Sequence, residues 1–202
     1  MSIISTHFDV SRETQDALDH LEVLVRKWNP RINLVAKSTL AALQDRHFAD
    51  GIALIRYGEG VGKWVDLGSG GGFPGLVVAI IEGGKRPIKL IESDGRKCAF
   101  LATARRELGL SVEIVNSRIE AADPQRAEVI SARALAPLPG LLEFSARHVA
   151  EDGALLFLKG ANWRSEDLVA RKNWEYDLEV FDNPAGTGSV ILKIKNARRI
   201  KQ

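Results

Sequence analysis

The chain has 202 residues, of which 45% are hydrophobic and 27% are charged, and its formal net charge is +2. This length suits one well-buried domain with a small accessory segment and excludes two full domains, and the composition is that of an ordinary soluble globular protein. The single cysteine, Cys98, excludes an internal disulfide framework and is typical of a reducing compartment. Because no segment has the pattern of a signal peptide or a membrane span, we expect a cytoplasmic protein with no membrane partner.

Two helices are predicted in residues 1–62. Ser11 is a candidate N-cap for the first, in which apolar residues recur at three- and four-residue spacing over 18–28. Pro30 predicts the end of this helix, because the residue before a proline is disfavoured in helical geometry. The second helix is predicted over residues 38–57. The glycine-rich stretch 58–62 then marks the boundary of this helical arm, which we expect to belong to the same compact unit as the rest.

From residue 63 to residue 202, short apolar runs alternate with helical segments, which predicts a mostly parallel α/β sheet with helices on both faces. The predicted strands are 64–67, 88–92, 112–115, 129–132, 154–158, 176–181 and 190–194. The predicted helices are 75–82, 96–108, 138–149 and 165–172. The last two strands are joined by a segment rich in glycine, asparagine and proline, so we expect an antiparallel hairpin at one edge of the sheet.

A glycine-rich turn follows the first of these strands. After Asp66, glycines stand at every second position from Gly68 through Gly70 to 72, a spacing that suits a turn passing close beneath a ligand. The dinucleotide fingerprint would need a third glycine where Phe73 stands. Glu92 ends the second strand, where a carboxylate can accept hydrogen bonds from both hydroxyls of a ribose. The turn therefore predicts a site for a nucleoside-like cofactor.

The third and fourth strands also run into polar segments, at 116–120 and 131–137. Because the carboxyl ends of parallel strands meet at the same edge of a sheet, we expect these segments to form one cleft with the glycine-rich turn.

This combination resembles the class I S-adenosylmethionine-dependent methyltransferases over roughly residues 63–195. The resemblance is narrowed by five segments: Asn33-Leu34, Arg46-His47-Phe48-Ala49-Asp50, the turn ending in Phe73-Pro74-Gly75, Arg133-Ala134-Leu135-Ala136, and Leu158-Lys159-Gly160. With these, the chain resembles the glucose-inhibited division protein B family, the bacterial methyltransferases of guanine N7 in 16S ribosomal RNA.

The resemblance implies a class I, Rossmann-like fold with a seven-stranded sheet and S-adenosylmethionine as the cofactor. It also implies that the partner is 16S rRNA or the small ribosomal subunit, and we expect the protein to be a monomer. The residues that the resemblance places on the cofactor are Gly68, Phe73, Ile119, Glu120 and Arg133. We add Gly70, because of the glycine spacing of the turn, and Glu92, because it ends the second strand.

Methyl transfer to guanine N7 requires no catalytic base, because this nitrogen carries a free lone pair at neutral pH. We therefore assign no catalytic residue, and expect positioning and exclusion of water to carry the reaction. The histidines lack the spacing of a metal site or a triad, so we expect no metal and expect surface or capping roles for His7, His20, His47 and His148. The candidates for RNA contact are Asn33, Arg46, His47, Lys159, Arg198 and Arg199.

Three alternatives stay open from the sequence. A nicotinamide-dependent reductase on a similar sheet is disfavoured, because the Tyr-x-x-x-Lys pair of short-chain reductases is missing: valine stands at the lysine position after both Tyr57 and Tyr176. A methyltransferase for a small metabolite fits the modest net charge. A non-catalytic RNA-binding protein on the same fold is the third.

Overall fold

The computed structural model describes residues 10–58, 60, 62–184 and 188–200. Its centre is a seven-stranded sheet in the order β3-β2-β1-β4-β5-β7-β6. The strands are β1 (Trp64–Leu67), β2 (Ile88–Glu92), β3 (Val112–Asn116), β4 (Ala127–Arg133), β5 (Val149–Lys159), β6 (Trp174–Asp182) and β7 (Val190–Arg199). β1 to β5 pair in parallel, whereas β7 is antiparallel to β5 and β6. The predicted α/β class and the antiparallel hairpin are confirmed.

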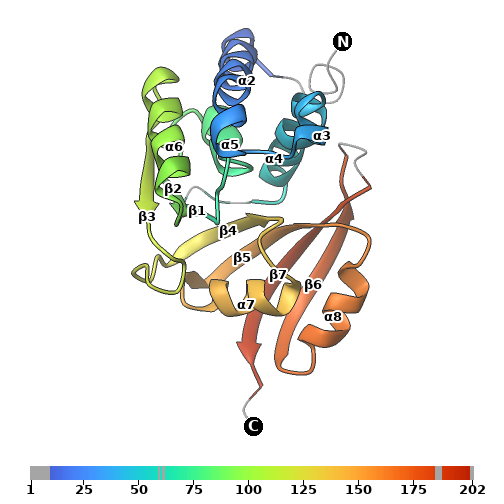
Figure 1. The fold of residues 1–202 in the computed structure, drawn as a ribbon. Coiled ribbons are helices and arrows are strands. Elements are labelled where there is room, and N and C mark those ends of the chain that lie inside the picture. Colours follow the sequence, from blue (N-terminus) through green and yellow to red (C-terminus); the bar gives the residue numbers. More distant parts are fainter. Residues whose placement is uncertain (1–9, 59, 61, 185–187, 201–202) are drawn as a thin grey trace.

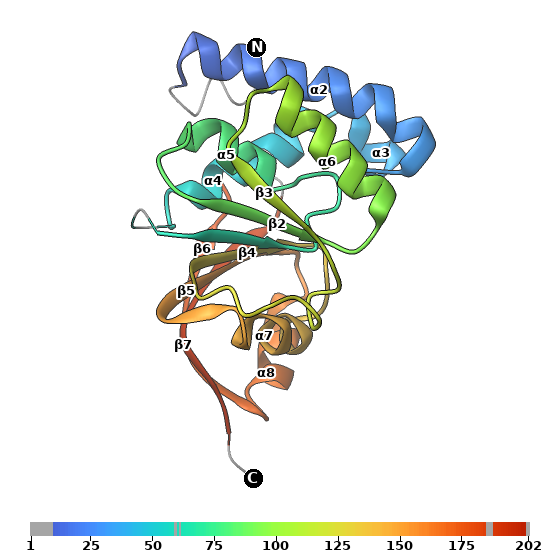
Figure 2. The same ribbon diagram turned by 90° about the vertical axis from the view of Figure 1, so that its left-hand side faces the viewer.

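Helices cover both faces of this sheet (Figures 1 and 2). The helices are α2 (Arg12–Ile32), α3 (Lys37–Leu40), the π-helix η1 (Gln44–Phe48), α4 (Ala49–Ile55), α5 (Gly75–Glu82), α6 (Gly95–Glu107), α7 (Leu138–Ala146) and α8 (Trp163–Ala170). The N-terminal helices lie with α5 and α6 on one face, and α7 and α8 lie on the other. No helix among the described residues is long and apolar enough to cross a membrane.

Successive side chains of β1 point to opposite faces of the sheet, so they belong to two different hydrophobic cores. Trp64 packs in the core beneath α2, α5 and α6, while Val65 and Leu67 pack in the core beneath α7. All three are fully buried, as expected for a central strand of a parallel sheet covered on both faces. The central strand is therefore packed on both faces, and its carboxyl end leads into the glycine-rich turn.

The first helix starts as predicted but ends later. The Ser11 hydroxyl accepts a hydrogen bond from the backbone N–H of Thr14 at 3.2 Å, which confirms the N-cap. The prediction that Pro30 ends the helix is wrong, since α2 continues to Ile32. A proline in the last turn removes only one backbone donor, and the left-handed Asn33 (φ 47°) then closes the helix. Residues of α2, α5 and α6 pack in one core. The division of the chain at residue 62 into a helical arm and a methyltransferase domain stays a prediction.

The predicted single helix over 38–57 is also wrong. The chain forms the short α3, turns at 41–42, and then passes through η1 into α4. A π-turn inserts an extra residue into the helix and so changes which side chains share a face. Here His47 and Asp50 both reach Arg133 of β4, 86 residues after His47. The local pattern of apolar residues gives no information about a partner so far away in the sequence, so this contact could not be predicted.

Candidate functional site

The glycine-rich turn is held in a backbone shape that favours glycine. Gly68 (φ 63°), Gly70 (φ 55°) and Gly72 (φ 87°) all have left-handed backbone angles. The N–H of Gly72 donates to the Ser69 carbonyl at 2.7 Å, which closes the turn. A Cβ built on Gly68 would lie 2.6 Å from Cδ1 of Leu135, so a side chain at this position would have to displace Leu135. The backbone itself forms the floor of the site.

Asp66 ties the end of this turn to β4. Its side chain is fully buried; Oδ1 accepts from the Ser131 hydroxyl at 2.7 Å, and Oδ2 accepts from the N–H of Gly75 at 3.2 Å. Ser131 in turn accepts from Nε1 of Trp64 at 2.9 Å. Burial raises the pKa of Asp66 to about 7, although the hydrogen bonds that Asp66 accepts from Ser131 and from the N–H of Gly75 oppose the shift. Asp66 therefore shapes the turn and does not reach a ligand.

Glu92 ties the end of β2 to the turn. Oε2 of its nearly buried carboxylate accepts from the N–H of Gly70 at 2.8 Å, and Oε1 accepts from the N–H of Asp94 at 2.8 Å. A carboxylate offers about four lone-pair positions, so acceptor capacity remains on both oxygens. Glu92 can therefore hold the turn and accept from a ligand at once.

A cavity of about 300 Å³ opens where these segments meet, at the carboxyl edge of the sheet. This volume is at the lower end of the range for small-molecule sites. It is lined by Gly68, Gly70, Ile91, Glu92, Ser93, Lys97, Ser117, Arg118, Ile119, Glu120, Ala134, Leu135 and Phe144. Five of the predicted cofactor residues are thus brought together: Gly68, Gly70, Glu92, Ile119 and Glu120.

The loop carrying Ile119 and Glu120 is anchored from the end of α7. His148 Nε2 lies 2.9 Å from the carbonyl oxygen of Ile119, and the Arg147 guanidinium donates to the carbonyl of Glu120. His148 is fully buried, and this burial lowers its pKa. The expected surface or capping role is therefore wrong for His148, and also for His47, which is 6% exposed. His20 is partly exposed and ion-paired with Glu107, whereas His7 lies outside the described residues.

Phe73 and Arg133 lie outside that cavity lining, on the side facing the N-terminal helices. Phe73 is 7% exposed and stacks on Phe48, with ring centroids 5.6 Å apart. Nε of Arg133 lies 3.1 Å from Oδ2 of Asp50, and its Nη1 contacts Nδ1 of His47. Arg133 directly follows Ala132, which pairs with Leu67 at the start of the turn. The predicted cofactor residues therefore fall into two groups, the five that line the cavity and the pair Phe73 and Arg133, which packs against the N-terminal helices.

The structure separates the residues predicted to bind RNA. All three of Asn33, Arg46 and His47 lie on the N-terminal elements. His47 contacts Arg133, and the exposed Arg46 lies near it, whereas Asn33 ends α2. Lys159 is 12% exposed and engaged within the fold, donating to Glu166 at 2.6 Å and to the carbonyl of Ala136 at 3.1 Å.

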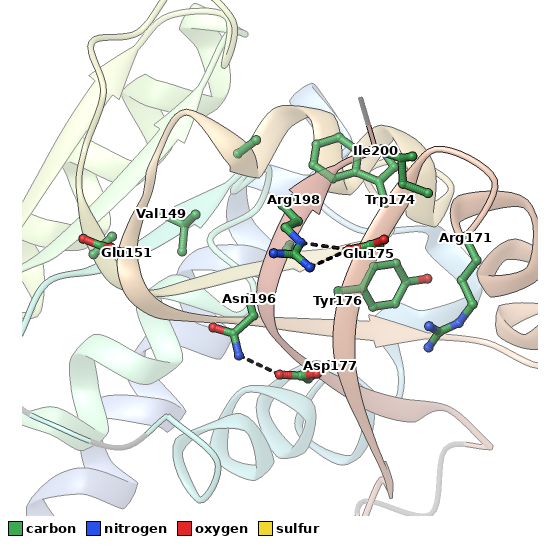
Figure 3. A pocket seen from close by; sticks show the side chains of 13 residues that line it. Val149, Glu151, Arg171, Trp174, Glu175, Tyr176, Asp177, Asn196, Arg198 and Ile200 are labelled. Carbon is green, nitrogen blue, oxygen red and sulfur yellow. Dashed lines mark hydrogen bonds and ion pairs between the residues drawn. The ribbon is translucent and has the colours of Figure 1, made fainter. Parts of the chain in front are cut away.

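Arg198 and Arg199 lie at the opposite edge of the sheet. β7 begins at the carboxyl edge, where Val190 pairs with Lys159, and runs away from it (Figure 1). Arg198 lines a separate cavity of about 1080 Å³ and is paired with Glu175 at 2.7 Å (Figure 3). Arg199 is paired with Glu143 at 3.2 Å. Lys201 and Gln202, at the C-terminal end of the sequence, lie outside the described residues.

Comparison with known proteins gives the family. A family model described as GidB, rRNA small subunit methyltransferase G, matches residues 14–186. The chain belongs to this family. A GidB relative from Ruegeria sp. (strain TM1040), named ribosomal RNA small subunit methyltransferase G, is 47% identical over 95% of both chains. One of the same name from Paracoccus denitrificans (strain Pd 1222) is 44% identical over 94% of this chain and 98% of its own.

Solved structures share the fold of this GidB protein at low sequence identity. A SAM-dependent methyltransferase from Aquifex aeolicus superposes with a TM-score of 0.60 at 15% identity, covering 76% of this chain and 92% of that one. A SAM-dependent O-methyltransferase from Thermotoga maritima has a TM-score of 0.56 at 15% identity, covering 76% and 66%. The class I methyltransferase fold predicted from the sequence is confirmed.

The cofactor that the family implies, S-adenosylmethionine, fits the residues of the cavity. The backbone of Gly68 presents no side chain to the ligand, and Glu92 keeps free lone pairs for hydroxyl donors. Among the described residues, no group of three or more His, Cys, Asp or Glu side chains is placed to hold a metal ion. Sequence reasoning missed Arg147, His148 and Ser131 as supports of the site, because their partners are strand and loop segments far away in the chain.

Proposed function

We propose that this enzyme transfers the methyl group of S-adenosylmethionine to N7 of a guanine in 16S ribosomal RNA. Membership of the GidB family across residues 14–186 carries the proposal, because the relatives are named for the RNA of the small ribosomal subunit. The activity belongs in the cytoplasm, where the small ribosomal subunit is assembled.

The two groups of residues around the glycine-rich turn suggest how the cofactor lies. The ends of β3, β2, β1 and β4 follow one another along the carboxyl edge. We place the adenine against the loop of Ile119 and Glu120, the ribose hydroxyls on Glu92, and the methionine part over Gly68 toward Arg133. Phe73 supports the turn by packing against Phe48, which keeps the floor in place.

The protein's part in this chemistry is to position the reactants. The bound cofactor supplies an electrophilic methyl group on a sulfonium. Guanine N7 needs no deprotonation, so the residues have only to hold the base in line and exclude water. His47 does not act as a base, because its Nδ1 already accepts from Arg133 and its Nε2 faces the Thr39 hydroxyl at 2.9 Å.

The proposal is tested with RNA from cells that lack this protein. The purified enzyme and radiolabelled S-adenosylmethionine are incubated with naked 16S rRNA or with small subunits, and the modified base is located by cleavage at N7-methylguanine. Incorporation at one guanine supports the proposal, and the more active substrate shows whether the assembled particle is required. Cofactor binding without methylated RNA would instead favour a small-molecule methyltransferase or a non-catalytic RNA-binding protein. Tight binding of NADPH without binding of S-adenosylmethionine would contradict the cofactor assignment.

We propose Arg46 as an RNA contact beside the site. Its guanidinium is exposed, it neighbours His47 and Arg133, and no described residue forms an ion pair with it. A cation that neutralises one phosphate contributes about 0.7 to the slope of log affinity against log salt on single-stranded RNA.

Replacing Arg46 with alanine is therefore expected to weaken RNA binding and to lower that slope by about 0.7. Arg198→Ala is the matched control, because Arg198 is already paired with Glu175 at the opposite edge. Filter binding at several salt concentrations measures both variants. An unchanged slope for Arg46→Ala, or an equal loss for Arg198→Ala, would contradict this placement.

A further inference from the structure

A buried polar cluster joins the N-terminal helices to the end of β4. It consists of His47 on η1, Asp50 on α4, Arg133 on β4 and Asn183 at the end of β6. His47, Asp50 and Asn183 are each 6% exposed or less, and the Arg133 side chain is 18% exposed. Buried polar groups need partners to offset the lost contact with water, and here three distant parts of the chain supply them. π-turns such as η1 are found frequently at functional sites.

The hydrogen bonds in this cluster give the Arg133 guanidinium a fixed orientation. Its Nε donates to Oδ2 of Asp50 at 3.1 Å, and its Nη1 donates to Nδ1 of His47. Because Nδ1 accepts, Nε2 of His47 carries the proton and donates to the Thr39 hydroxyl at 2.9 Å. The Thr39 hydroxyl in turn donates a hydrogen bond to the carbonyl oxygen of Ala36 at 3.0 Å. A guanidinium has five N–H donors, so this arrangement leaves donors for a ligand.

The cluster itself carries no net charge, and a further positive charge, that of Arg46, lies beside it. Burial, followed by the nearby guanidinium groups of Arg133 and Arg46, lowers the pKa of His47 to about 3, so this histidine is neutral at pH 7. The negative charge of Asp50 balances the positive charge of Arg133. The side-chain amide of Asn183 donates to Oδ1 of Asp50 at 2.5 Å. With Arg133 balanced by Asp50, the exposed Arg46 beside the cluster supplies the one positive charge in excess. An anionic group of a ligand would complete the cluster.

The position of the cluster along the sheet identifies that anionic group. Glu92 and Ile119 lie at the ends of β2 and β3, whereas Arg133 lies beyond Gly68 at the end of β4. An elongated nucleoside whose ribose lies at Glu92 extends its other end toward Arg133. In S-adenosylmethionine that end carries the carboxylate of the methionine part, and arginine binds carboxylates with two parallel hydrogen bonds.

We propose that Asp50 is a positioning residue that orients Arg133 to bind the carboxylate of the cofactor's methionine part, with His47 as its second support. The proposal rests on the function proposed above, because it takes S-adenosylmethionine as the ligand. Asp50 touches no part of the cofactor. It acts by fixing one edge of the guanidinium so that the remaining donors face outward.

The test compares two ligands that differ at this end. 5′-Methylthioadenosine keeps the adenosine, the sulfur and the methyl group of S-adenosylmethionine. It lacks the aminocarboxypropyl chain, which carries the carboxylate. Asp50→Asn is expected to weaken S-adenosylmethionine binding roughly tenfold or more in calorimetry, because a charge-assisted hydrogen-bond arrangement is lost. Binding of 5′-methylthioadenosine is expected to change less than about twofold, since it makes no contact with Arg133. A merely structural role would weaken both ligands together.

Asp177→Asn is the matched control. The Asp177 carboxylate also accepts from an asparagine amide, that of Asn196 at 2.6 Å, but it lies on β6 in the cavity at the opposite edge (Figure 3). This variant should bind both ligands as the wild type does. Equal losses of both ligands in Asp50→Asn, or no loss of either, would overturn the positioning role. A wild-type protein that binds neither ligand would instead contradict the proposed function.

A second comparison serves where Asp50→Asn alone does not fold. Removing one partner of a buried ion pair leaves an unpaired charge, whereas Arg133→Gln with Asp50→Asn removes both charges. If Asp50 acts through Arg133, the double variant and Arg133→Gln should bind S-adenosylmethionine equally weakly. A further tenfold loss in the double variant would show that Asp50 acts independently of Arg133, and would overturn the proposal.

Discussion

Replacing Gly68 with aspartate is expected to abolish S-adenosylmethionine binding, with a loss of at least about a hundredfold. Gly68 has φ 63°, an angle that costs a residue with a side chain roughly 1–2 kcal/mol. The new Cβ would also lie 2.6 Å from Cδ1 of Leu135, within the lining of the cavity. The added carboxylate would stand in the same cavity as Glu92, where its burial is unfavourable. Calorimetric titration with S-adenosylmethionine measures the effect.

Gly109→Asp is the control for the backbone part of this effect. Gly109 also has φ 63°, but nothing lies within 4 Å of a Cβ built there, and it lies between α6 and β3 at the opposite edge of the sheet. This variant should lose a similar amount of stability and keep its affinity for the cofactor. Wild-type affinity in Gly68→Asp would show that the ligand binds elsewhere. An equal loss of affinity in Gly109→Asp would show that destabilisation, and not the site, explains the result.

The sequence predicted the part of the fold that local patterns determine. β1, β2 and α5 have the predicted bounds, because short apolar runs there stand directly between turn residues. Gly68, Gly70 and Glu92 belong to those same segments, so their meeting in one cavity could be expected from the topology of a parallel sheet. Strands farther along the chain are longer than predicted. β5 begins at Val149 and not at 154, because Val149 has the apolar character predicted for the end of a helix and Glu151, Asp152 and Gly153 have the character of a turn.

Residues whose partners are distant in sequence could not be placed in this way. His47 and His148 have polar side chains that usually face solvent, yet both are buried, because Arg133 and the carbonyl of Ile119 provide hydrogen bonds. The opposite case is Arg198, whose location follows from the hairpin that the sequence did predict. An antiparallel strand that begins at the carboxyl edge ends at the other edge, and so carries Arg198 away from the cofactor cavity.

The Asp66→Asn variant is expected to differ from the wild type in how stability depends on pH. Burial raises the pKa of Asp66 to about 7 in the folded protein, against its ordinary value of 3.8. Between about pH 4 and pH 7 the folded protein keeps this proton while the unfolded chain has lost it. The folded state therefore binds more protons, and the contribution of Asp66 to stability falls as the pH rises. Over this interval the fall is on the order of 4 kcal/mol.

His47 gives the opposite dependence over part of the same range. Its pKa is lowered to about 3 in the folded protein, so below its ordinary value of 6.5 the unfolded chain binds the additional proton. The contribution of His47 is complete above about pH 6.5 and is lost as the pH falls toward 3. The two residues partly cancel, and the stability of the wild type alone does not separate them.

Comparing the wild type with Asp66→Asn removes this cancellation, because His47 is present in both. Asparagine can accept from the N–H of Gly75 and donate to Ser131, so the turn keeps its hydrogen bonds. Urea unfolding at pH 4, 5.5, 7 and 8 gives the free energy of unfolding of each protein. The wild type should lose stability relative to the variant from pH 4 to pH 7, with no further change at pH 8. A difference that does not vary with pH would show that Asp66 titrates at the same pH in the folded and the unfolded chain. The glycine-rich turn would then be anchored by an ionised carboxylate across this whole range.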